Sequence, residues 1–65
     1  MKLLDVVALT QDCPDLGLYC GNVGTIVEEY EPGVFEVEFI DTSGKVYAIE
    51  TLESSQLMVL YRPAL

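Results

Sequence analysis

The sequence contains no histidine and only two cysteines, Cys13 and Cys20. A Ser–His or Cys–His catalytic pair is therefore excluded. A zinc site needs three or four ligands, and two cysteines without a CxxC motif supply too few. Acidic residues such as Glu36 and Glu38 follow strand alternation on an exposed face, whereas acid–base catalysis uses carboxylates in unlike, partly buried surroundings. We expect no catalytic residue, no cofactor and no metal, and a protein that is not an enzyme.

Cations are also scarce, because three Lys and Arg residues stand against eleven Asp and Glu residues, for a net charge of −8. Nucleic-acid affinity depends on cations that displace counterions from phosphates, so direct nucleic-acid binding is disfavoured. An anionic membrane surface is disfavoured for the same reason. The acidity suits either a basic protein partner or simply a solvated acidic surface.

No apolar run is long enough to span a membrane. The mostly apolar residues 1–10 are interrupted by Asp5 and are not followed by a small-residue cleavage site, so we expect no signal peptide. The predicted location is the cytoplasm. Cys13 and Cys20 are then expected to stay reduced, as small, partly buried residues that flank a loop.

Hydrophobic residues make up 51% of the 65 residues. Residues 1–65 form one domain at most, and a domain this short buries only about 60% of the surface that its unfolded chain exposes. The apolar excess predicts a surface for association, and a homo-oligomer is the simplest form that it could take.

Short β-branched segments separated by turn residues predict an all-β fold. The clearest strand is 34–40, where Phe35, Val37 and Phe39 alternate with Glu36 and Glu38. The other strands expected are 5–10, 23–30, 45–52 and 57–61.

The connections define the architecture. The loop 11–21 carries Leu16, Leu18 and Tyr19, which indicates that it folds back over the core. Gly24 predicts a close backbone approach, a bulge or a bend. Asp5 is expected at the surface, and 53–56 is too short for more than one 3-10 turn. Five strands, a long first loop and this late turn predict a small SH3-like β-barrel; an OB-fold would need a helix for which the chain has no room.

Tyrosine is the one large amphipathic side chain in the sequence, and it is favoured at interfaces. The alternative is that two or three of the tyrosines cap the core. Together with the acids of the outer strand face, they are the candidate partner-binding residues: Tyr19, Tyr30, Glu36, Glu38, Tyr47 and Tyr61.

Two resemblances add to this interpretation. Residues 21–28, GNVGTIVE, resemble the turn and strand of KOW-type SH3-like barrels in ribosomal proteins and transcription factors, although RNA-binding members carry basic residues where this chain has acids. With residues 3–10 and 57–60, the whole chain is similar to a family of short bacterial proteins, common in cyanobacteria, known as a domain of unknown function. That resemblance implies an SH3-like fold and a bacterial source, and it brings no site residues.

The hypothesis is a non-enzymatic protein-interaction module with a regulatory or accessory role, which also self-associates. One alternative is an acidic module that reaches nucleic-acid machinery through a basic protein. Another is an antitoxin-like or immunity-like protein.

Overall fold

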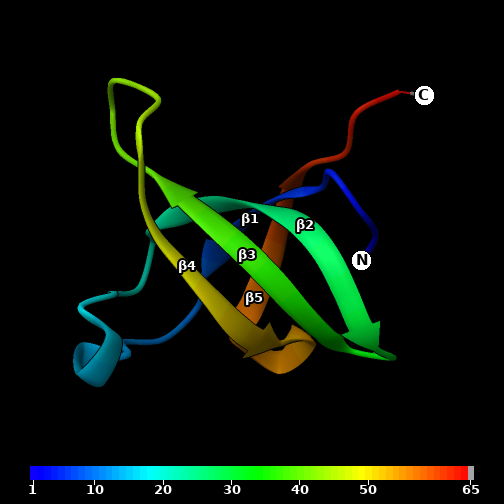
Figure 1. The fold of residues 1–65 in the computed structure, drawn as a ribbon, viewed down its shortest axis with the longest axis horizontal. Helices are drawn as coiled ribbons and strands as arrows, with labels where there is room; N and C mark the ends of the chain where they lie inside the picture. Colours follow the sequence, from blue (N-terminus) through cyan, green and yellow to red (C-terminus); the bar gives the residue numbers. More distant parts are fainter. Residues whose placement is uncertain (65) are drawn as a thin grey trace.

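The computed structural model describes residues 1–64, which form one antiparallel sheet of five strands (Figure 1). The all-β, five-stranded prediction is confirmed, with strand bounds within one residue or so of those expected. The 3-10 turn expected at 53–56 is present, and a second one lies in the first loop. The elements are β1 (Val6–Leu9), η1 (Pro14–Leu16), β2 (Val23–Glu31), β3 (Val34–Ile40), β4 (Val46–Glu53), η2 (Ser54–Gln56) and β5 (Leu57–Tyr61).

The strand order is β4-β3-β2-β1-β5. β2, β3 and β4 follow one another as hairpins, while β5 returns to pair with β1. In Figure 1 the part of the sheet made by β2, β3 and β4 crosses in front of β1 and β5, so the sheet bends over its own core. β4 and β5 are the two ends of the ladder, and closure into a barrel stays a prediction.

The core lies between these two parts of the sheet. In β3, Phe35, Val37 and Phe39 are buried at 2% exposure or less, which confirms the predicted alternation. The loop contributes Leu18, which is fully buried, whereas Leu16 and Tyr19 of the same loop are exposed. The cluster draws on every strand: Val7, Leu9, Leu18, Ile26, Phe35, Val37, Phe39, Leu52 and Leu57.

Gly24 allows the sheet to bend tightly. A Cβ added there would lie 2.6 Å from the carbonyl oxygen of Glu38 and 2.7 Å from Cγ1 of Val37. The predicted close approach is confirmed, because only glycine leaves room for the β3 backbone at this point. Two register shifts in the pairing of β2 with β3 lie further along, between Ile26 and Glu28 and between Glu29 and Glu31.

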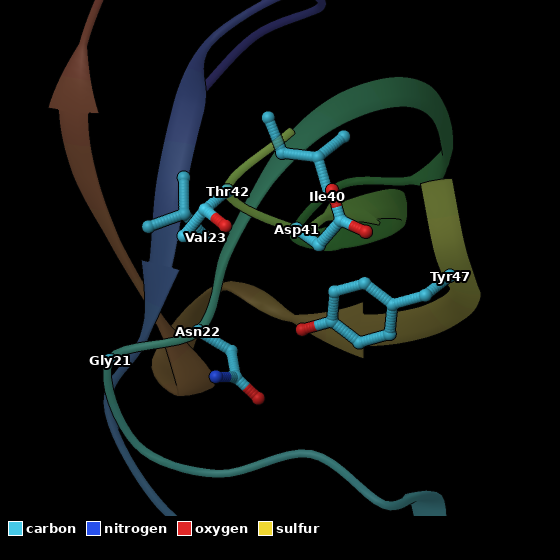
Figure 2. A pocket seen from close by; sticks show the side chains of 7 residues that line it. All are labelled: Gly21, Asn22, Val23, Ile40, Asp41, Thr42 and Tyr47. Carbon is cyan, nitrogen blue, oxygen red and sulfur yellow. The ribbon is translucent and has the colours of Figure 1, made fainter. Parts of the chain in front are cut away.

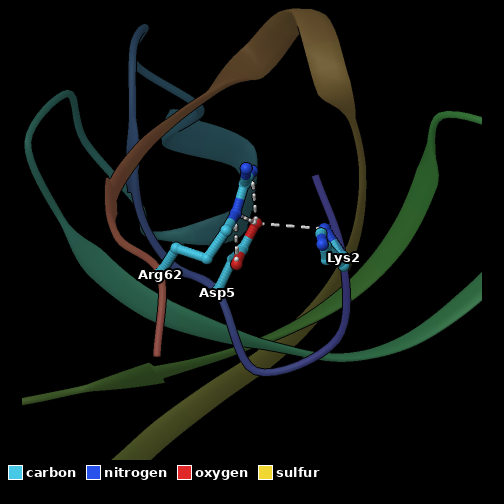
Figure 3. Close-up of polar contacts among 3 residues, drawn as sticks. All are labelled: Lys2, Asp5 and Arg62. Carbon is cyan, nitrogen blue, oxygen red and sulfur yellow. Dashed lines mark hydrogen bonds and ion pairs between the residues drawn. The ribbon is translucent and has the colours of Figure 1, made fainter. Parts of the chain in front are cut away.

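Asp5 is the main correction to the sequence-based expectations. We expected it at the surface, but it is fully buried at the start of β1. Its carboxylate accepts bonds from Nε of Arg62 at 3.1 Å, from Nη2 of Arg62 at 3.0 Å and from the backbone N–H of Lys2 at 3.0 Å (Figure 3). A buried carboxylate persists only when it is paired and hydrogen-bonded in this way.

The N-terminal turn is shaped around this carboxylate. The Asp5 N–H donates to the carbonyl of Lys2, and Leu4 between them has a φ of 72°. A left-handed conformation is unfavourable for a residue with a bulky side chain. It is held here because the Leu4 N–H donates to the carbonyl of Ile26 at 2.8 Å.

The described chain, residues 1–64, holds no helix with the length and apolar character needed to cross a lipid bilayer.

The buried ion pair predicts acid sensitivity. The hydrogen bonds from Arg62 hold the pKa of Asp5 below its ordinary value. The stabilisation is therefore present above the pKa of the unfolded chain, and is lost as the pH falls below about 4. In urea titrations at several pH values, Asp5→Asn should lower the midpoint at neutral pH and flatten its decline in acid. The control is Asp15→Asn, at an exposed acid in η1, and an equal effect of the two variants would contradict the prediction.

The close approach at Gly24 predicts that Gly24→Ala destabilises the fold by about 1–3 kcal/mol, the usual range for overpacking. Urea unfolding measures this free energy. Gly44→Asn is the control, because Gly44 has a φ of 84° and open space around it, and asparagine tolerates that conformation. A Gly24→Ala variant as stable as the wild type would show that β3 moves away at little cost.

Candidate interaction face

Three neighbouring strands present side chains away from the core on one surface, which we call the outer face. The register places Glu38 between Thr25 of β2 and Ile49 of β4, and Glu36 between Glu28 and Thr51. The register shifts between Phe39 and Ile40, and beyond that shift Ile40 and Tyr47 line one hollow at the end of this surface. The outer face consists of Thr25, Glu28, Tyr30, Glu36, Glu38, Ile40, Tyr47, Ile49 and Thr51.

Two like charges face each other in the middle of the outer face. Glu28 and Glu36 are directly paired across β2 and β3. Like charges in that position destabilise a sheet. No ion pair within residues 1–64 involves either of them, since the one that forms joins Asp5 and Arg62. The fold therefore tolerates an unneutralised acidic pair at this position.

Tyr30 is tied to this pair. Its hydroxyl donates to Oε1 of Glu36 at 2.6 Å, although Tyr30 itself is 56% exposed. The hydrogen bond to Glu36 raises the pKa of the Tyr30 phenol, with smaller contributions from burial and from the charges of Glu36 and Glu28. The bond fixes the Tyr30 ring beside the acids, so an aromatic surface and negative charge lie side by side.

A hollow of about 510 Å³ opens at one end of the outer face (Figure 2). The turn between β3 and β4 forms one side of it, and the chain that leads into β2 forms the other. In Figure 2 the Tyr47 ring borders the hollow, and its hydroxyl is directed toward the side where Asn22 lies. The lining residues are Gly21, Asn22, Val23, Ile40, Asp41, Thr42 and Tyr47.

Asp41 is the charged group of the hollow, and its own turn holds it in place. Its Oδ1 accepts from Ser43 N–H at 2.9 Å, from Ser43 Oγ at 2.6 Å and from Lys45 N–H at 3.0 Å. The Ser43 hydroxyl, followed by the backbone N–H groups, lowers the pKa of Asp41. The carboxylate is therefore both ionised and fixed in direction at neutral pH.

The structure brings together four of the six candidate binding residues. Tyr30, Glu36, Glu38 and Tyr47 share the outer face, whereas Tyr19 lies in the first loop and Tyr61 at the end of β5. All four tyrosines are 48–63% exposed, so none of them is buried as a core residue.

Sequence reasoning missed Glu28, Ile40 and Ile49 as binding residues of the outer face, and Asp41 as a residue of the hollow. The alternation in residues 45–52 places Ile49 on the same strand face as Tyr47, but only the tyrosine is among the predicted binding residues. Asp41 carried a turn signal, and that signal gave no indication that its carboxylate would border a hollow formed with Asn22.

The cysteines and acids suggest no second site. Both thiols are free, with Cys13 half-buried against the core and Cys20 exposed. Among residues 1–64, no three Cys, Asp or Glu side chains lie in positions that could hold a metal ion.

A small five-stranded antiparallel domain with an exposed acidic and aromatic face is the class of protein that this geometry defines. The profile of DUF4926, described as a domain of unknown function, matches residues 3–59, and the chain belongs to that family. No curated protein matches the chain, and no solved structure does either.

The Tyr30–Glu36 bond predicts one late-titrating tyrosine. An ultraviolet titration of the phenols should show a component from Tyr30 with a pKa above the ordinary tyrosine value of about 10. Tyr30→Phe should remove that component, and Glu36→Gln should lower its pKa. Tyr61→Phe is the control, because it should leave the late component in place. A titration in which Glu36→Gln changes nothing would contradict the bond.

Proposed function

We propose that this protein is a non-enzymatic protein-interaction module whose outer face binds a basic protein. The observation that carries the proposal is the pairing of Glu28 with Glu36 among exposed aromatic and aliphatic side chains. A basic partner would neutralise the two acids and cover the apolar side chains in one step, and each contribution would favour the complex.

The distribution of apolar side chains supports an interaction role. Thirteen large hydrophobic residues are exposed among residues 1–64, against ten buried hydrophobic residues. Single exposed hydrophobic residues are ordinary, but contiguous ones mark interaction surfaces. The outer face carries four of the thirteen: Ile40, Tyr47 and Ile49 lie together at one end, and Tyr30 lies at the other end beside Glu36.

The charge favours a different protein over a second copy at the outer face. Two copies that met through this surface would bring Glu28 and Glu36 of one against the same acids of the other, and each chain carries a net charge of −8. Like-charge contacts of that kind suppress a complex. Self-association, where it occurs, would use another surface, such as the exposed Met58 and Leu60 of β5.

We further infer a regulatory or accessory role in a bacterial cytoplasm. The net charge disfavours direct contact with nucleic acid. A basic partner from nucleic-acid machinery fits both the acidity and the KOW-like residues 21–28, because many such proteins carry basic segments.

The proposal predicts opposite effects of one variant on binding and on stability. Glu28→Gln removes the repulsion across β2 and β3, so unfolding should require a few tenths of a kcal/mol more free energy. The same change should weaken the complex severalfold at low salt, since a charge that faces the partner is lost.

The test begins with purification of the tagged protein from its own cells at low salt and identification of the retained protein. Calorimetry of the purified pair then compares wild type, Glu28→Gln and the control Asp15→Asn over rising salt. We expect the retained partner to be basic and its affinity to fall as the salt concentration rises. Glu28→Gln should weaken the binding, and Asp15→Asn should not. An affinity that is independent of salt, or no retained partner, would refute the proposal.

A further inference from the structure

We propose that the hollow beside Tyr47 is the anchor site of this face and takes one arginine or lysine side chain from the partner protein. The inference rests on the proposed function, because it names the group that the outer face would recognise. It is carried by three features of the hollow, namely its apolar wall, its fixed carboxylate and the lack of an ion pair to that carboxylate within residues 1–64.

The wall suits the stem of a long basic side chain. Val23, Ile40 and the ring of Tyr47 supply apolar surface on adjoining strands, and the volume of about 510 Å³ exceeds what a single side chain needs. Lysine and arginine bury their methylene stems against such surfaces while the charged head reaches a polar group. The 48% exposed Tyr47 ring also offers a face on which a guanidinium or ammonium group can lie.

The charge at the rim is prepared for a cation. Three hydrogen bonds within the turn engage Oδ1 of Asp41, and no bond within residues 1–64 engages Oδ2. A carboxylate already fixed by its turn loses little conformational entropy when it binds. Its free oxygen can accept a charge-assisted hydrogen bond, which is stronger than one between neutral groups.

Within residues 1–64, no lysine or arginine side chain forms an ion pair with Asp41. Lys45 donates its backbone N–H to Asp41, but its side chain forms no ion pair in the described part of the chain. Arg62 is held by the buried Asp5 at the other end of the fold. The Asp41 carboxylate is therefore open to a cation from another molecule.

The rest of the outer face points to a protein as the source. Along β3, Glu36, Glu38 and Ile40 are two residues apart, which places neighbouring ones roughly 7 Å from each other on the same side of the strand. An extended chain has the same spacing between alternate side chains. A segment with basic residues at alternate positions would seat one of them in the hollow and direct the next toward Glu38.

The probe is the peptide acetyl-Thr-Arg-Thr-Arg-Thr-amide, titrated into isotope-labelled protein and followed by backbone amide NMR. The control peptide has citrulline in place of each arginine, which keeps the shape of the side chain and removes its charge. N-acetylarginine methylamide tests the free small molecule. We expect the arginine peptide to shift the amides of Asn22, Thr42 and Tyr47, and the citrulline peptide to bind at least about tenfold more weakly.

Variants separate the features of the hollow. Asp41→Asn keeps an oxygen for the turn and loses the charge, so binding should weaken about tenfold. Tyr47→Leu should weaken it about two- to fivefold, and Tyr47→Phe, which keeps the ring, should restore it. Tyr61→Leu, at a more exposed tyrosine at the end of β5, should have no effect.

The outcomes distinguish this inference from the proposed function. If Glu36→Gln weakens the arginine peptide and the Asp41 and Tyr47 variants do not, the face binds basic segments and the hollow is not the anchor. Equal binding of the citrulline peptide, or no binding at millimolar peptide, overturns the inference. So does equal binding of N-acetylarginine methylamide, which would indicate a small-molecule site. If the same amides shift when the protein concentration is raised without any peptide, the hollow is occupied by a second copy of this protein.

Discussion

The buried carboxylate of Asp5 is the constraint on which the arrangement of the chain ends depends. A carboxylate without partners in that position would be strongly unfavourable, so Arg62 and the N–H of Lys2 must reach it. The backbone of Asp5 also accepts from the N–H of Ile26 at 3.0 Å. One residue thereby fixes the N-terminal turn, the start of β1, its contact with β2 and the end of β5.

The small size of the domain explains why so much of its apolar surface stays outside. A bent sheet of five short strands has one interior, and ten hydrophobic residues fill it. Side chains that alternate with them must face solvent, whatever their chemistry. In β3 these are acids, whereas in β4 they are Tyr47 and Ile49, so the outer face mixes charge with apolar area.

Much of the fold could be predicted from the sequence because its signals are local. Alternation in residues 34–40 and glycine at position 24 each report on backbone and burial within a few residues. The role of Asp5 could not be predicted, because its partner Arg62 lies 57 positions away and only the pairing of β1 with β5 brings them together. The hollow was missed for the same reason, since Asn22 and Tyr47 meet only in the folded sheet.

The use of the few cations connects stability with the proposed binding role. Arg62 neutralises the one acid that is buried, where an unpaired charge would be most unfavourable. Glu28, Glu36 and Asp41 form no ion pair within residues 1–64 and lie at the surface, where solvent and salt weaken the repulsion between acids. A face neutralised by its own lysines would be more stable and would attract a basic partner less. The acids without an ion pair, which lower the stability of the fold slightly, therefore lie on the face that we propose to bind a basic partner.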